Sequence, residues 1–192
     1  MEQLRVTERD REYLYWLSQA PGMGAVTIKR LWDRYHSFEN IYNMEETPLR
    51  EQGFLNINQA KGFKQWKGRL EQCRDAYGKL GDKGIRFVSF LDGEYPGRLR
   101  QLYASPAALY VRGRLPGEDR PTAAIVGARD CSHYGRETAE LLGRALGEAG
   151  IQVVSGMALG IDGAGHSGCL KGGGDTYAVL GCGVDICYPR SH

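Results

Sequence analysis

The last third of the sequence alternates short apolar runs with helical stretches that end at glycine, and this alternation constrains the fold more than any other feature. Three runs predict buried strands, at residues 123–126, 151–155 and 176–180. Two stretches between them predict helices, at residues 135–149 and 161–171. The first helix carries an apolar stripe of Leu141, Leu142, Ala145 and Leu146. Strands and helices in this order pair in parallel through right-handed crossovers. The expected class is therefore α/β, with the front half of a doubly wound, Rossmann-like parallel sheet.

The first part of the sequence predicts helices instead of a sheet. Apolar residues recur at helical spacing and glycines interrupt them, which predicts a small helical bundle with helices that include residues 57–66 and 70–80. Gly22-Met23-Gly24 has the form of a helix-hairpin-helix turn, which could offer amides to a DNA phosphate near Lys29 and Arg30. An ordinary glycine-broken hairpin is the commoner alternative, and we favour it.

Composition marks the expected domain boundaries. Two short strands, at residues 85–90 and 108–113, lie between the helices and the sheet. A stretch rich in proline, glycine and charge then covers residues 113–121, as expected for a linker. There are 15 glycines in residues 121–192 and 12 in residues 1–120. We expect a helical domain at 1–82, a connector at 83–121 and a Rossmann-like domain at 122–192.

Several classes of protein fit the composition poorly. No run of about eighteen apolar residues is present, so we expect no membrane span. The charged first ten residues lack the apolar core of a secretion signal. The cysteines are odd in number and form no CxxC pair, which argues against a disulfide framework and against a metal site; they are Cys73, Cys131, Cys169, Cys182 and Cys187. Thiols in a reducing cytoplasm are the simplest interpretation.

Charge is unevenly distributed along the chain. Residues 1–120 hold 20 lysines and arginines against 16 acidic residues, whereas residues 121–192 hold 5 against 7. An anion site in the last third must therefore depend on a few placed cations and on backbone amides.

Three glycine-rich loops are expected at one edge of the sheet, because ligands of such folds bind beyond the carboxyl ends of the strands. Missing Cβ atoms would let a phosphate approach the amides, and the helix starts near Gly135 and Ile161 would point positive dipole ends toward it. The candidate binding residues in these loops are Gly127, Ala128, Arg129, Ser155, Gly156, Gly160, Gly181, Gly183 and Arg190.

Arg129 follows the first strand of the sheet directly. Its planar guanidinium could hold a phosphate through two hydrogen bonds or stack on a base. Pairing with Asp130 is an equally good interpretation on spacing alone. Arg129 also stands where the second glycine of a dinucleotide-binding GxGxxG loop would lie, so that fingerprint is absent.

Two further groups of residues are better explained by structure than by chemistry. Asp162 and His166 lie four residues apart on one helix and could form an acid/base pair, but Asp162 in a first turn more often caps free amides. A basic cluster is expected to be a solvated face; it consists of Lys61, Lys64, Lys67, Arg69 and Arg74.

The motifs of the last two thirds resemble the DprA/Smf family of DNA-processing proteins. The resemblance rests on residues 125–129, Tyr134-Gly135, residues 154–162, His166, residues 178–185 and Tyr188-Pro189, in this order and spacing. Residues 92–96 and 106–113 resemble the family's linker, and the first helices resemble its sterile-alpha-motif-like domain.

This resemblance implies a cytoplasmic protein of natural transformation and recombination. It would protect incoming single-stranded DNA and load the RecA recombinase on it, without catalysis, cofactor or metal, and the full-length protein would be a homodimer. Arg129 matches the family's pocket arginine, Arg190 the basic position after its tyrosine-proline pair, and Ser155 and Gly156 its second pocket loop.

The sequence departs from the family pattern in three ways. Ala128 stands where serine is usual, and Leu159 where a basic residue is common. The chain also stops at His192, so we expect a fragment of the family fold. A nucleotide-binding module stays open as an alternative function. A phosphoribohydrolase is a weaker one, because its Pro-Gly-Gly-x-Gly-Thr loop is absent.

Overall fold

The computed structural model describes residues 7–190. The chain divides into two compact units, and the division falls between Val111 and Arg112. The boundaries expected after residues 82 and 121 divide the chain more finely and stay predictions.

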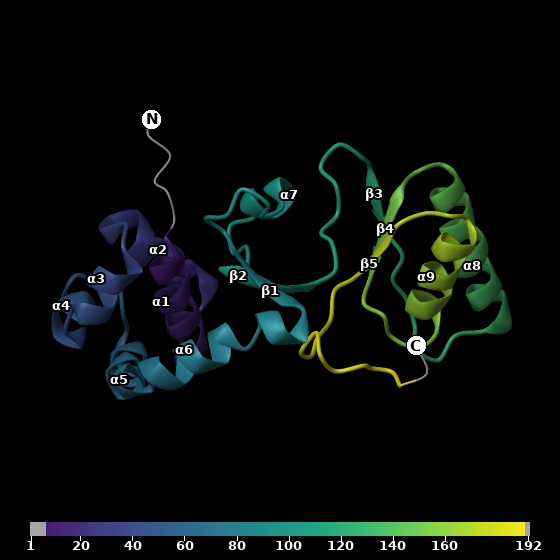
Figure 1. Ribbon diagram of the computed structural model, residues 1–192. Coiled ribbons are helices and arrows are strands. Elements are labelled where there is room, and N and C mark those ends of the chain that lie inside the picture. The colour runs from purple at the N-terminus through teal and green to yellow at the C-terminus, as the bar shows by residue number, and fades with distance from the viewer. Residues whose placement is uncertain (1–6, 191–192) are drawn as a thin grey trace. The chain divides into compact units, whose positions relative to one another are not determined.

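Unit 1 begins with helices joined by short turns (Figure 1). They are α1 (Glu8–Gln19), α2 (Ala25–Tyr35), α3 (Phe38–Asn43), α4 (Glu46–Glu51), α5 (Ile57–Trp66) and α6 (Leu70–Gly78), with 3-10 turns η1 (Lys67–Arg69) and η2 (Gly81–Lys83). Thr7 starts α1 through a capping box with Asp10, in which each side chain bonds to the other residue's amide. The helices expected at 57–66 and 70–80 correspond to α5 and α6, whereas the short α3 and α4 were not predicted.

The core of unit 1 is aromatic. Trp16 is fully buried, and its indole N–H donates to the carbonyl of Trp66 at 3.0 Å. The indole of Trp66 donates back to the carbonyl of Trp16 at 3.1 Å. Each ring therefore places its polar atom on the other residue's backbone, which fixes α5 against α1.

Two strands complete unit 1. They are β1 (Ile85–Ser89) and β2 (Ala108–Arg112), which form a two-stranded sheet, with the single turn α7 (Gly97–Arg100) between them. Both strands lie where the sequence predicts them.

Unit 2 contains a parallel sheet whose strand order is β3-β4-β5. The strands are β3 (Thr122–Ala124), β4 (Gln152–Ser155) and β5 (Thr176–Ala178). Ala123 lies beside Val153, and Val154 lies beside Tyr177. Helices α8 (His133–Glu148) and α9 (Ile161–Lys171) both cover the same face (Figure 1). The α/β class and the parallel pairing are thus confirmed. The strands are shorter than the apolar runs, and α8 begins two residues before the predicted start.

The expected linker before β3 is bonded to the sheet. Gln152 is fully buried at the start of β4. Its amide oxygen accepts from the Gly117 amide at 2.8 Å, and its amide nitrogen donates to the Gly117 carbonyl at 2.9 Å. A bidentate contact of this kind mimics strand pairing, so the segment around Gly117 is part of unit 2.

Helices α8 and α9 contact each other through their backbones. A Cβ atom at Gly143 would lie 2.3 Å from the Gly165 carbonyl oxygen, and one at Gly168 would lie 2.0 Å from the Glu140 carbonyl oxygen. Such contacts are possible only without side chains, as in small-residue helix interfaces.

The apolar stripe of α8 is not its packed face. Leu141 is 68% exposed and Leu142 is 53% exposed, whereas Ala139, Gly143 and Gly147 are buried. Periodicity therefore indicated the wrong face, because the contact with α9 is made by glycines that carry no hydrophobic signal.

We predict that Gly168→Ala destabilises unit 2. The new methyl group would overlap the Glu140 carbonyl. Overpacking costs about 1–3 kcal/mol, which exceeds the ~1 kcal/mol that alanine gains over glycine in a helix. The far-ultraviolet circular dichroism transition in urea should move to lower urea concentration. Tryptophan fluorescence should not move, because Trp16, Trp32 and Trp66 all lie in unit 1.

The matched control is Gly78→Ala, at a helical glycine of α6 where an added Cβ atom would meet nothing within 4 Å. We expect no loss of stability there. A Gly168→Ala variant as stable as the parent chain would show that α8 and α9 can separate without cost.

Candidate nucleic-acid interface

All three predicted loops leave the same edge of the sheet of unit 2, because the strands are parallel. The first loop follows β3, the second follows β4 and the third follows β5. Nine predicted site residues lie in them or at the end of β4: Gly127, Ala128, Arg129, Ser155, Gly156, Gly160, Gly181, Gly183 and Arg190. The first two loops contact each other closely. In the third, Gly181 faces open space, and the nearest atoms to Gly183 belong to its own loop.

The first loop lies directly on the start of α9. A Cβ atom at Gly160 would lie 2.3 Å from the Ala128 carbonyl oxygen and 2.5 Å from that of Arg129. The amide of Ile161 donates to the Ala128 carbonyl at 3.2 Å. The first amide of α9 is therefore bonded within the protein.

Asp162 joins the two loops. Its side chain is buried, and only 5% of the residue is exposed. One carboxylate oxygen accepts from the Gly127 amide at 3.3 Å, and the other accepts from the Gly156 amide at 3.1 Å. Both amides, which were expected to face a phosphate, are thus bonded to a carboxylate of the protein itself. Asp162 does cap amides as predicted, but they belong to two loops distant in sequence.

The second loop has a fixed backbone path. Ser155 is buried, and its hydroxyl donates to the Ile125 carbonyl at 2.5 Å, so this hydroxyl holds the start of the first loop. Met157 has a φ of 56° and Gly160 a φ of 78°, both in the left-handed region. A positive φ is strained for a residue other than glycine, so Met157 keeps it only because the surrounding structure holds the backbone there. The hydrogen bond from the neighbouring Gly156 amide to Asp162 is one such contact.

Arg129 is exposed on the first loop. Within residues 7–190 its guanidinium makes neither an ion pair nor a hydrogen bond, so the alternative of a pair with Asp130 is not realised. Arg190 is also exposed, in the third loop. Arg129 thus presents a free guanidinium on a backbone that Gly160 and Ile161 hold.

Asp162 and His166 do not form an acid/base pair. The carboxylate of Asp162 is committed to two amides, and Nδ1 of His166 lies 2.6 Å from the hydroxyl of Thr176 on β5. No group of three or more histidine, cysteine or acidic residues that could hold a metal occurs in the described part of the chain. No helix among residues 7–190 is long and apolar enough to cross a membrane.

Comparison with known proteins identifies the family. The family model described as DNA recombination-mediator protein A matches residues 86–192, more than half of the chain. The chain belongs to this family.

Relatives in other organisms extend the match to both units. Protein Smf of Synechocystis is 34% identical over 191 residues, which cover 93% of this chain and 46% of the relative. The DNA processing protein DprA of Streptococcus pneumoniae is 40% identical over 126 residues, which cover 65% of this chain and 44% of the relative. The chain thus spans less than half the length of these two curated relatives.

A solved structure agrees with the fold. The X-ray structure of DNA processing protein A from Streptococcus pneumoniae matches with a TM-score of 0.71 and 30% identity. The match covers 94% of this chain and 61% of that chain.

The hairpin turn of unit 1 offers few amides to a ligand. The amide of Met23 donates to Ala20, and that of Gly24 donates to Gly22. Lys29 bonds to Ser105, and Arg30 donates to the Gly53 carbonyl at 3.1 Å. The structure therefore agrees with the ordinary hairpin that we favoured.

The basic cluster of unit 1 is largely paired with neighbouring groups. Lys64 lies 2.8 Å from Glu46, and Arg74 lies 3.2 Å from Glu12. Lys67 donates to the Met44 carbonyl at 2.6 Å.

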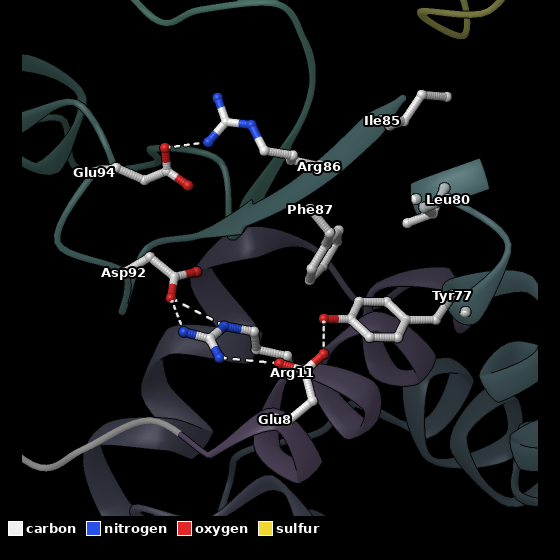
Figure 2. Close-up of a pocket in the computed structure, with 11 residues that line it drawn as sticks. Glu8, Arg11, Tyr77, Leu80, Ile85, Arg86, Phe87, Asp92 and Glu94 are labelled. Atoms are coloured by element: carbon white, nitrogen blue, oxygen red, sulfur yellow. Dashed lines mark hydrogen bonds and ion pairs between the residues drawn. The ribbon is translucent and has the colours of Figure 1, made fainter. Parts of the chain in front are cut away.

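A cavity of about 390 Å³ lies in unit 1, lined by α1, the end of α6, β1 and the turn after β1 (Figure 2). Its charged residues bond to one another. Arg11 donates to Asp92 at 2.5 and 3.0 Å, and Tyr77 donates to Glu8 at 2.8 Å. None of the predicted site residues lines it. These bonds form a network that joins α1 to the turn after β1 and to the end of α6.

Asp92 is the centre of this network. Burial alone would raise the pKa of its carboxyl, but hydrogen bonds from Arg11 and from Ser89 outweigh burial and hold the pKa below its usual value. A depressed folded-state pKa stabilises the fold above the unfolded pKa, and that stabilisation disappears as the pH falls through the folded pKa.

We predict that Asp92→Asn lowers the stability of unit 1 at pH 7 by about 1.5–3 kcal/mol, the usual value of hydrogen bonds to a charged group. As the pH falls through the depressed pKa of Asp92, the parent chain loses the same interaction, so the difference between the two should shrink. Urea unfolding followed by tryptophan fluorescence at pH 7 and across the acid range measures this.

Asp75→Asn is the control, because Asp75 forms an exposed ion pair with Lys79 at 2.5 Å. Such pairs contribute only about 0.3–0.5 kcal/mol. A destabilisation by Asp92→Asn that stayed constant with pH would contradict the assigned role of its charge.

Proposed function

We propose that this chain binds single-stranded DNA at the carboxyl edge of the sheet in unit 2, as part of a non-catalytic protein of DNA processing and recombination in natural transformation. Membership of the DNA recombination-mediator protein A family supports the process. The observation that carries the site is the state of Arg129. Its guanidinium is exposed and has no partner among the described residues, and its loop is held by the hydrogen bond from Ile161 to Ala128.

In this proposed site the DNA would be bound by side chains more than by backbone amides. The amides of Gly127 and Gly156 are occupied, and residues 121–192 hold more acidic than basic residues. Attraction for a phosphate backbone then depends on a few placed cations, of which Arg129 follows β3 and Arg190 is exposed in the third loop.

Exposed aromatic residues favour a single strand over a duplex. Tyr134 is 77% exposed in the first turn of α8, and Tyr188 is 52% exposed in the third loop. Unpaired bases stack on such rings without regard to sequence, and a duplex hides those faces.

Catalysis is not part of the proposal. The side chains of Asp162 and His166 are engaged in bonds that fix loops and strands. The same occupied amides argue against the alternative of a nucleotide-binding module or a phosphoribohydrolase.

A more specific role is proposed for a longer protein of the length that the relatives have. We infer that it works in the cytoplasm as a homodimer, protects incoming strands and loads the RecA recombinase on them. The family's description as a recombination mediator supports the link to a recombinase. The homodimer rests on the sequence resemblance alone.

We predict that Arg129→Ala weakens binding of a labelled oligothymidine roughly tenfold to a hundredfold, because charge-assisted hydrogen bonds contribute about 1.5–3 kcal/mol. Loss of one phosphate contact should also reduce the salt dependence of binding by about 0.7 in log–log slope. Arg129→Lys should recover only part of the affinity, since a point charge cannot replace the planar fork. Fluorescence anisotropy across a salt series measures all three.

The matched control is Arg144→Ala. Arg144 is likewise exposed in unit 2 but pairs with Glu148 at 2.8 Å near the far end of α8. We expect little change in affinity. Unchanged binding by Arg129→Ala, or equal affinity of the parent chain for a duplex of the same length, would count against the proposed site.

A further inference from the structure

We propose that Asp162 is a built-in anion that fills the amide cradle at the carboxyl edge and thereby positions Arg129. The inference rests on the proposed function, because it assigns the residue on which the DNA contact of that site depends. Asp162 is a positioning residue here and does not touch the DNA itself.

The first step is the order of contacts between the start of α9 and the first loop. Gly160 packs against the backbone of Arg129 and Ala128, Ile161 donates to the carbonyl of Ala128, and Asp162 accepts the amide of Gly127. The two segments thus run past each other in opposite directions: residues 160, 161 and 162 contact residues 129, 128 and 127 in turn. The side chain of Ile161 also packs against Gly127, but of these contacts only that of Asp162 is a side-chain hydrogen bond, so it can be removed without altering the backbone.

The second step is the convergence of two loops on one carboxylate. The Gly127 amide follows β3, and the Gly156 amide follows β4. A Cβ atom at Gly156 would lie 2.7 Å from the carboxylate oxygen, so the loop approaches as closely as a glycine permits. Two amides and the positive end of α9 together form the kind of cradle that takes a phosphate in other folds.

The third step is electrostatic. A ligand phosphate at this cradle would have to displace a buried carboxylate or lie beside it, and like charges at such distances repel strongly. A free nucleotide therefore finds no phosphate cradle here. A strand must bind through side chains carried by the loops, and Arg129 can do so only while its loop is fixed.

The test is chemical rescue. Asp162→Ala removes the carboxylate and leaves space that a small anion can fill. We expect this variant to bind oligothymidine roughly tenfold more weakly than the parent, similar to Arg129→Ala, and Asp162→Ala with Arg129→Ala to be little weaker than either alone. Formate, substituted for chloride at constant ionic strength, should restore affinity in Asp162→Ala and should not in Arg129→Ala.

A purely structural role of Asp162 would give a different result. It would lower the stability of unit 2 in circular dichroism without a specific response to formate in DNA binding. A folded Asp162→Ala chain that binds like the parent overturns the proposal. If this variant is unfolded, Asp162→Asn takes its place, since it keeps the shape and loses the charge; unfolding of both also overturns the proposal.

Failure of the proposed function can be told apart from failure of this inference. If the parent chain does not bind oligothymidine at all, the proposed function is wrong. Hydrogen exchange of the Gly127 and Gly156 amides then decides the positioning role without DNA. Faster exchange of both in Asp162→Asn supports the role, and unchanged exchange overturns it.

Discussion

Unit 2 depends on the close approach of α9 to α8 and to the loop after β3. The residues of α9 and its caps that make the closest contacts have no room for a side chain: Gly160, Gly165, Gly168 and Gly172. Two of them meet the backbone of α8 directly, and Gly160 meets that of the first loop. This approach brings the start of α9 under the loops after β3 and β4. The carboxylate of Asp162 can therefore reach both loops, because the helix contacts are made by glycine.

Much of the fold could be predicted from the sequence. The three apolar runs correspond to β3, β4 and β5, and their alternation with helices is enough to fix parallel pairing, because crossover connections of this kind have one preferred hand. The packed face of α8 could not be predicted from periodicity. Leu141 and Leu142 dominate its hydrophobic pattern, yet Gly143 and Gly147, spaced one turn apart, make the contact with α9. Two glycines at that spacing are the signal that could have shown the correct face.

The sequence predicted where the loops of the candidate site lie, but not which groups their amides contact. Loops at the carboxyl edge of a parallel sheet follow from topology. Whether their amides are free depends on acceptors distant in sequence, and local composition does not indicate these. Asp162 could be seen as an amide cap, but its partners Gly127 and Gly156 lie in other loops. Glycine-rich loops after parallel strands therefore do not by themselves indicate a phosphate site, since the protein can supply the anion. Arg129 then becomes the group through which the edge can attract DNA.

The most direct test of this account is a nuclear magnetic resonance titration of the parent chain with oligothymidine. Resonances from the Arg129 side chain and from the Gly127 and Gly156 amides would be followed together. The account predicts a large shift of the Arg129 Nε resonance, while both glycine amides keep their shifts and their protection from exchange. Large shifts of the Gly127 and Gly156 amides with an unmoved Arg129 side chain would contradict it, because the strand would then occupy the cradle that Asp162 is held to fill.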